Sequence, residues 1–135
     1  MVILVAEDEA LVALVLELAL AAAGHRVLGP AATAAGALRL AEAGRPDLAL
    51  LDINLAEGGD GVALARALRD RHGTPSLFLS GQTLQARAAR DAAWGLVRKP
   101  YDPGAVVRAV EGVGEIMSGR RPRPLPRELE LFREA

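Results

Sequence analysis

Apolar and polar residues follow one another along the chain in blocks that predict a strand and then a helix, five times over. Residues 2–6 form a continuous apolar run with β-branched members, which is typical of a buried parallel strand. Residues 10–23 are mostly Leu and Ala, which favour a helix, and Gly24 suits the position that ends it. The order then repeats, with strands at 26–30, 47–51, 75–79 and 95–98 and helices at 34–43, 61–71, 82–93 and 103–117.

This alternation predicts an α/β fold. Strands that are joined by helices of this length run parallel, with helices on both faces of the sheet. We therefore expect a five-stranded parallel sheet of the flavodoxin-like (βα)5 type. Thr33 and Asp102 are expected to cap the helices that follow them, and Pro103 suits a first helical position.

Residues 118–135 differ in composition from residues 1–117, which we expect to form the folded domain. Residues 120–126 are basic and proline-rich, which predicts an extended linker, and residues 128–135 predict a short helix. Leu125, Leu129 and Phe132 lie at spacings that put them on one helical face. Two interpretations stay open: a frayed linker, or a segment that docks on the domain or on a partner.

The composition narrows the class of protein. The chain has 135 residues, of which 51% are hydrophobic and 24% charged, with a net charge of −1, and this describes one globular domain. There is no cysteine, which excludes disulfides, thiolate metal sites and cysteine nucleophiles. Aromatic residues make up only 3%, and no basic stripe accompanies them, so we expect no DNA binding.

The N-terminal apolar run has no basic flank and leads directly into Glu7, Asp8 and Glu9, unlike a signal peptide. The apolar stretch after Glu9 is interrupted by Glu17 and is too broken to span a bilayer. We therefore expect a cytoplasmic protein that makes no contact with membranes.

Polar side chains follow four of the five predicted strands. Glu7 and Asp8 come after the first strand, Asp52 after the third, Ser80 after the fourth and Lys99 after the fifth. Sites in open parallel sheets form at the carboxyl ends of the strands, so these side chains are expected to converge. Lys99 is the only lysine among 16 Lys and Arg residues. Either this is chance, or position 99 requires a compact ammonium group instead of a guanidinium group.

Three neighbouring carboxylates repel one another, and a hard divalent cation such as Mg²⁺ removes that repulsion. With an ammonium and a hydroxyl group beside them, they suit phosphoryl transfer, in which a carboxylate can be the nucleophile. Each residue also has an ordinary interpretation. Asp8 or Glu9 can cap a helix, Asp52 can be a turn residue, and Ser80 and Lys99 can simply end their strands.

Taken together, these segments resemble the receiver domains of two-component response regulators. The resemblance covers residues 1–117 and rests on five segments: Ile3–Glu9, Asp47–Asp52, Gly58–Gly61, Ser80–Gly81 and Lys99–Pro100. Each segment alone is a weak signal, whereas all five in this order and spacing are a strong one.

The resemblance implies a role for each residue of the cluster. Asp52 would accept the phosphoryl group, and Ser80 and Lys99 would bind its oxygens. Asp8 would bind Mg²⁺ directly, Glu7 through water, and Asn54 through its backbone carbonyl.

The resemblance also implies partners. A histidine kinase or a histidine phosphotransferase would donate the phosphoryl group, and a downstream protein would bind the face made by the fourth helix, fifth strand and fifth helix. A stand-alone receiver is expected, because residues 118–135 are too few for an output domain. Whether it forms a homodimer is left open.

Two positions depart from the common receiver pattern. Leu96 stands where receivers often carry a switching aromatic residue. The segment Pro75–Gly81 resembles a subgroup with a Phe-x-Thr-Gly-Tyr stretch at the fourth strand, but here Gln82 replaces the tyrosine. The signal is therefore expected to travel without an aromatic ring at either position.

Three further functions compete with this one. The first is a receiver-like scaffold that is never phosphorylated. The second is an FMN carrier, which needs a phosphate-binding loop where this chain has Glu7, Asp8 and Glu9. The third is a metal-dependent phosphatase, for which no second catalytic acid is spaced suitably beside Asp52.

Overall fold

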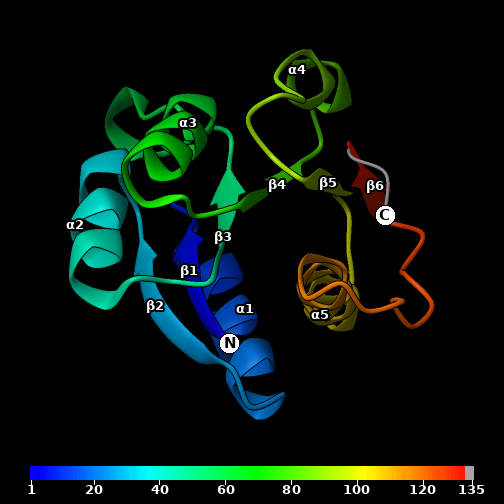
Figure 1. The fold of residues 1–135 in the computed structure, drawn as a ribbon. Helices are drawn as coiled ribbons and strands as arrows, with labels where there is room; N and C mark the ends of the chain where they lie inside the picture. The colour runs from blue at the N-terminus through cyan, green and yellow to red at the C-terminus, as the bar shows by residue number, and fades with distance from the viewer. Residues whose placement is uncertain (133–135) are drawn as a thin grey trace.

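The computed structural model describes residues 1–132, and all five predicted strand–helix units are present in it (Figure 1). The strands are β1 (Val2–Ala6), β2 (Arg26–Ala31), β3 (Leu48–Asp52), β4 (Ser76–Ser80), β5 (Gly95–Arg98) and β6 (Leu129–Leu131). The helices are α1 (Ala10–Ala22), α2 (Ala34–Gly44), α3 (Gly61–His72), α4 (Thr83–Ala88) and α5 (Pro103–Met117), with one 3-10 turn at Ala56–Gly58.

The sheet has the strand order β2-β1-β3-β4-β5-β6. The first five strands in this order pair in parallel, as the sequence predicts. The sixth pairs antiparallel with β5 and was not predicted. The parallel α/β fold is thus confirmed, with one strand more than expected.

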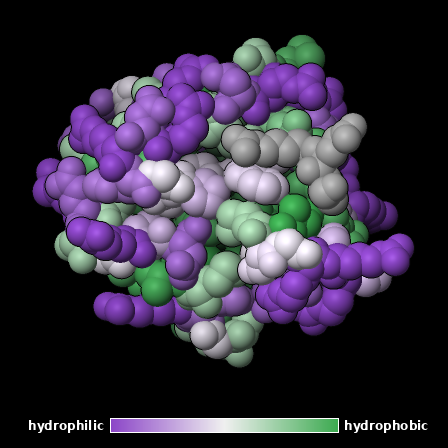
Figure 2. Space-filling view, viewed as in Figure 1, coloured by the Kyte–Doolittle hydropathy of each residue, from purple (hydrophilic) through white to green (hydrophobic). Residues whose placement is uncertain are grey.

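Two apolar layers hold the helices on the sheet. Side chains of β1, β3 and β4 alternate between the layers, because successive residues of a strand point to opposite faces. Leu4, Leu51 and Phe78 pack on the side of α2, α3 and α4. Ile3 and Leu50 pack on the opposite side, against α1 and α5. Figure 1 shows α1 and α5 together on one face of the sheet. Figure 2 gives the same view and shows mostly hydrophilic residues over α3.

Side chains cap the helices where the sequence predicts caps. Thr33 accepts a hydrogen bond from the backbone of Gly36 at 3.0 Å, and Asp102 accepts one from Gly104 at 2.8 Å. Helix α4 is shorter than the predicted 82–93, because the chain turns after Ala88 and the backbone N–H of Trp94 already bonds to Ser76 at the start of β4.

The predicted helix over residues 128–135 is wrong for the part that the structure describes. Leu129–Leu131 form a strand, because the open edge of β5 offers hydrogen bonds that an isolated short helix could not match. Leu129 and Leu131 pack toward α5, whereas Phe132 packs on the side of α4. The tail therefore docks on the domain, but as a strand, and residues 133–135 lie outside the described part.

Within residues 1–132, no helix has the length and apolar character needed to cross a membrane.

Candidate functional site

The polar residues predicted from the sequence meet at one edge of the sheet. Asp52 and Ser80 are the last residues of β3 and β4, and Glu7 and Lys99 directly follow β1 and β5. They converge because parallel strands in register all end at the same edge. A cavity of about 290 Å³ opens there, lined by Asp8, Glu9, Asp52, Asn54, Ser80, Gly81, Gln82 and Lys99.

Three carboxylates form the acidic part of this site. One oxygen from each of Glu7, Asp8 and Asp52 lies within 4.8 Å of the others. Glu7 is only 2% exposed and Asp52 only 7%, whereas Asp8 is exposed. Glu7 and Asp52 thus offer carboxylate oxygens from inside the domain, and Asp8 offers one from the surface. A cation held between them would still be reached by water or a ligand.

Lys99 supplies the positive charge. Its Nζ donates a hydrogen bond to Oδ2 of Asp52 at 3.0 Å and lies 3.6 Å from Oε1 of Glu7. Burial lowers the pKa of Lys99, but the hydrogen bond and the charge of Asp52 outweigh this, and the pKa lies above its ordinary value. Lys99 therefore stays protonated at neutral pH.

Glu7 has a raised pKa in this cluster. Burial raises its pKa to about 7, and the charge of Asp52 raises it as well, against the lowering effects of the Glu9 backbone N–H and of Lys99. Its Oε1 is buried and accepts no hydrogen bond. A buried carboxylate oxygen that lacks a hydrogen bond and lies beside two further carboxylates fits a hard divalent cation such as Mg²⁺.

Neutral polar side chains also line the cavity, namely those of Asn54, Ser80 and Gln82. The Oγ of Ser80 accepts a hydrogen bond from the backbone of Gln82 at 2.9 Å. The backbone of Asn54 donates to Oδ1 of Asp52 at 3.0 Å, and its side-chain amide donates to Oε1 of Gln82 at 3.3 Å. This bridge between Asn54 and Gln82 spans the mouth of the site and could not be predicted from residues 28 positions apart.

The geometry also tests the ordinary interpretations of these residues. Glu9, not Asp8, occupies the N-cap position of α1, and its side chain makes no capping hydrogen bond. Asp52 does accept a turn-type hydrogen bond from Asn54, yet its other oxygen faces Lys99. Asp52 is therefore a turn residue and a member of the cluster at once.

Gly61 is a positioning residue whose part in the site was not identified from the sequence. A Cβ at this position would overlap the backbone carbonyl of Asp52. The backbone N–H of Gly61 donates to Ile53 at 2.7 Å, so the start of α3 lies directly against the end of β3. The signal in the sequence was a glycine just after the capping residue Asp60, which accepts a hydrogen bond from Val62.

Leu96, at the position of the expected aromatic switch, is fully buried in the α4-side layer. Tyr101 lies close enough to the site for the charges of Lys99, Glu7 and Asp52 to act on it. Its hydroxyl is buried without a hydrogen bond, and burial raises the pKa of Tyr101 to about 12.

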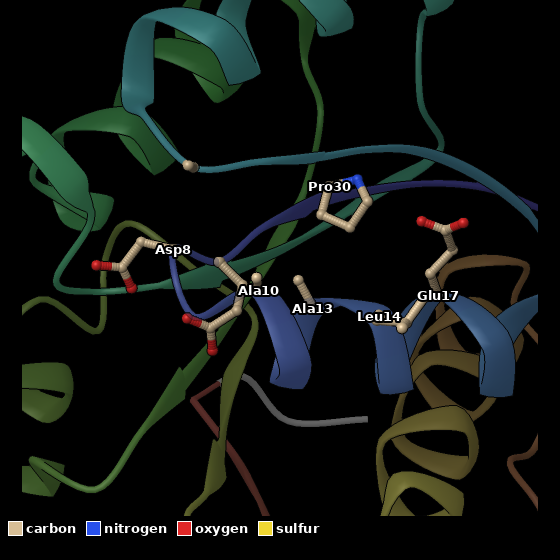
Figure 3. Close-up of a pocket in the computed structure, with 8 residues that line it drawn as sticks. Asp8, Ala10, Ala13, Leu14, Glu17 and Pro30 are labelled. Carbon is tan, nitrogen blue, oxygen red and sulfur yellow. The ribbon is translucent and has the colours of Figure 1, made fainter.

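Helix α1 presents an apolar stripe beside the site. The stripe consists of Leu11, Leu14, Val15 and Leu18, of which Leu11 is 74% and Leu18 60% exposed. A groove of about 300 Å³ runs beside α1 from Asp8 toward Glu17, with Pro30 on its far wall (Figure 3). Leu14 is the stripe residue that lines it, so the groove connects the acidic site with one edge of the stripe.

Comparisons with known proteins agree with this geometry. The family model described as the response regulator receiver domain matches residues 3–111. The chain is 35% identical over 106 residues to the phyllosphere-induced regulator PhyR of Methylorubrum extorquens, a match that covers 77% of this chain and 40% of PhyR. It is 30% identical over 112 residues to the transcriptional regulatory protein PdtaR of Mycobacterium tuberculosis, covering 81% of this chain and 54% of PdtaR.

A solved structure gives the same answer for the fold. A putative response regulator from Chloroflexus aurantiacus superposes with a TM-score of 0.74 at 31% identity, covering 83% of this chain and 95% of that one. The chain spans about half or less of the curated relatives that it matches, namely 40% of PhyR and 54% of PdtaR.

Proposed function

Because the chain belongs to the family of response regulator receiver domains, we propose that it accepts a phosphoryl group on Asp52 and signals through altered contacts with a partner protein. A receiver domain is a signalling module rather than a classical enzyme.

One observation carries the proposal. Asp52 ends β3 in a cavity, with Lys99 at 3.0 Å from one oxygen and the carboxylates of Glu7 and Asp8 close by. In the transfer, a carboxylate oxygen of Asp52 forms a bond to phosphorus while the bond from phosphorus to the donor atom breaks. The donor leaves with that electron pair, and Asp52 becomes an acyl phosphate.

The side chains around Asp52 are suited to this step. Lys99 balances negative charge on the incoming phosphoryl oxygens, and the Ser80 hydroxyl can rotate to donate a hydrogen bond to one of them. Glu7, Asp8, Asp52 and the backbone carbonyl of Asn54 would hold Mg²⁺. The cation, when bound, neutralises charge between the carboxylates and the phosphoryl oxygens.

The phosphoryl donor is proposed to be a histidine kinase or a histidine phosphotransferase, since receiver domains interact with histidine kinases. The α1 stripe supports this, because a donor protein has to dock close to the site, and the stripe residue Leu14 lines the same groove as Asp8. A downstream protein partner is proposed for the face of α4, β5 and α5. Neither DNA nor membrane contact is part of the proposal, and a homodimer is compatible with it.

The test uses acetyl phosphate, Mg²⁺ and intact-protein mass spectrometry on the wild type, Asp52→Asn and the exposed control Asp70→Asn. We expect one phosphoryl adduct, formed as acetate leaves the donor, that requires Mg²⁺ and is missing only in Asp52→Asn. An adduct that persists in Asp52→Asn contradicts the acceptor assignment. No adduct, together with no Mg²⁺ binding, would favour the unphosphorylated scaffold.

An FMN carrier and a metal-dependent phosphatase find less support in this geometry. An FMN carrier would place a phosphate where Glu7 and Asp8 lie, and their charges would repel it. A metal-dependent phosphatase would need a general acid beside Asp52. Glu7 and Asp8 are the acids that lie there, and both are proposed to hold the cation.

A further inference from the structure

The tail of the chain runs along the face that the proposed function assigns to a downstream partner. We call residues 120–132 the strap. The strap leaves α5, passes along that helix and then pairs with β5 as β6 (Figure 1). Figure 1 places β6 at the outer edge of the sheet, next to β5.

The proline-rich part of the strap is held on α5. The guanidinium of Arg108 donates to the backbone carbonyls of Arg123 and Pro124, both at 3.2 Å. The guanidinium of Arg123 donates to Glu115 at 3.0 Å. Leu125 lies against Gly112, where a Cβ would overlap its side chain. A segment that looked like a linker is therefore fastened by directional contacts and by close packing.

The strand part of the strap is held by α4 and β5 together. Glu130 accepts two hydrogen bonds from Arg87 of α4, at 2.7 and 2.8 Å, and lies 3.8 Å from Arg98 of β5. The backbone N–H of Phe132 donates to Trp94 at 2.8 Å. Gly95 permits the pairing, because a Cβ there would come within 2.5 Å of the Glu130 carbonyl.

Residues of the phosphoryl site lie directly beside both of these elements. Ser80 precedes α4 by three positions and pairs in register with Arg98 of β5. Lys99 follows Arg98, whose backbone N–H donates to the Glu128 carbonyl of the strap at 2.9 Å and whose guanidinium donates to the Arg127 carbonyl. The strap thus bridges α4 and β5. In the proposed function, Ser80 exchanges its contact with Gln82, and Lys99 its contact with Asp52, for contacts with a phosphoryl group. Both exchanges take place next to the elements that hold the strap.

We propose that the strap is an internal occupant of the α4–β5–α5 face, and that phosphorylation of Asp52 loosens it and uncovers the β5 edge for a partner's extended strand. This inference rests on the proposed function. The strap itself indicates the chemistry of the partner segment: an acidic side chain toward Arg87 and Arg98, flanked by apolar residues toward α5. The strap keeps this surface closed until the site is filled.

Linkage makes the proposal measurable from both directions. If filling the site opens the strap, then a variant in which the strap is open must bind the mimic more tightly, by at most the factor that couples the two events. Glu130→Arg replaces an attractive contact with a repulsive one at Arg87, and Glu128→Arg is the matched control, because its side chain has no ion pair in the described structure.

The experiment uses the full chain with Mg²⁺ and beryllofluoride, a stable mimic of the phosphoryl group. Amide exchange of Phe132 and Arg98, whose N–H groups donate across the junction of β5 and the strap, is followed by NMR. The affinity for the mimic is followed by isothermal titration calorimetry. We expect these two amides to exchange at least about tenfold faster with the mimic bound, while those of β1 stay unchanged. We expect Glu130→Arg, but not Glu128→Arg, to bind the mimic at least about fivefold more tightly.

The outcomes separate the two proposals. If the mimic does not bind and acetyl phosphate gives no adduct, the proposed function fails and the strap mechanism fails with it. If the mimic binds but neither the exchange of Phe132 nor the effect of Glu130→Arg follows, the strap proposal alone is overturned. Faster exchange in β1 as well would mean general loosening of the fold and would also count against the strap.

Discussion

The ammonium nitrogen of Lys99 lies 3.0 Å from Oδ2 of Asp52 and 3.6 Å from Oε1 of Glu7, so one cation serves two buried carboxylates. An incoming phosphoryl group competes for the same ammonium. Lys99 is therefore placed to respond to the chemistry at Asp52 without forming a bond in it.

Lys99→Ala should slow phosphorylation without abolishing it. The variant loses a charge that stabilises the transferred group, but Asp52 and the carboxylates around it remain. We expect labelling by acetyl phosphate to fall by about tenfold, and the exchange change at Phe132 to be lost. Intact-protein mass spectrometry measures the first and NMR the second. Labelling as fully absent as in Asp52→Asn would show that Lys99 is required for the transfer itself.

Glu7 should make the metal-free protein less stable as pH rises from about 4.5 to about 7. The pKa of Glu7 is raised from 4.5 to about 7 in the folded state, mainly by burial, so the folded protein binds more protons than the unfolded chain across this window. Thermal unfolding at several pH values measures the effect. Glu7→Gln should remove most of this slope, and a slope unchanged in that variant would contradict the assignment to Glu7.

Mg²⁺ should stabilise the protein more at pH 8 than at pH 6. Above its raised pKa of about 7, Glu7 is ionised and Mg²⁺ offsets the repulsion with Asp52, whereas below it a proton competes with the cation. The rise in Tm with added Mg²⁺ gives the comparison, with Ca²⁺ as a second ion. An equal rise at both pH values would show that Glu7 takes no part in binding the cation.

Gly61→Ala should destabilise the fold and slow phosphorylation. The added methyl group would overlap the carbonyl of Asp52 and push α3 away from the end of β3. We expect a loss of about 1–3 kcal/mol in the free energy of unfolding. Gly81→Ala is the control for stability, since a Cβ there would meet only the Lys99 Cβ, at an ordinary 3.9 Å. Equal losses in the two variants would refute the packing argument.

Two leucines of α1 should behave differently. Leu16 is 1% exposed and belongs to the α5-side layer, so Leu16→Ala should cost about 2–5 kcal/mol of unfolding free energy. Leu18 is 60% exposed, and Leu18→Ala should cost about 0.5 kcal/mol or less. Denaturant unfolding measures both. A large loss in Leu18→Ala would mean that the stripe is covered by another part of the molecule.

The parallel sheet could be predicted because each strand has its own local signal. The runs at Val2–Ala6 and Leu48–Asp52 are apolar almost throughout, since both faces of a parallel strand are buried. The convergence of Glu7, Asp52 and Lys99 followed in turn, because it depends only on which residues end the strands.

The strap could not be predicted in the same way. The spacing of Leu125, Leu129 and Phe132 fits a helix, but the alternation of Leu129, Glu130 and Leu131 fits a strand equally well. The open edge of β5 decides between the two patterns, because it offers hydrogen bonds to a strand. That edge exists only once the sheet has assembled, so the sequence of the tail alone does not contain it. The bridge from Asn54 to Gln82 and the packing of Gly61 on Asp52 likewise depend on distances that only the fold creates.

The three residues of β6 also change the way in which the sheet ends. Without them, every second residue along β5 would present unpaired N–H and C=O groups to solvent, which is the kind of edge along which separate molecules join into a continuous sheet. With them, the outermost strand is shorter and places a charged side chain, Glu130, at its centre. The segment that closes the partner face therefore also protects the protein from pairing with its own copies.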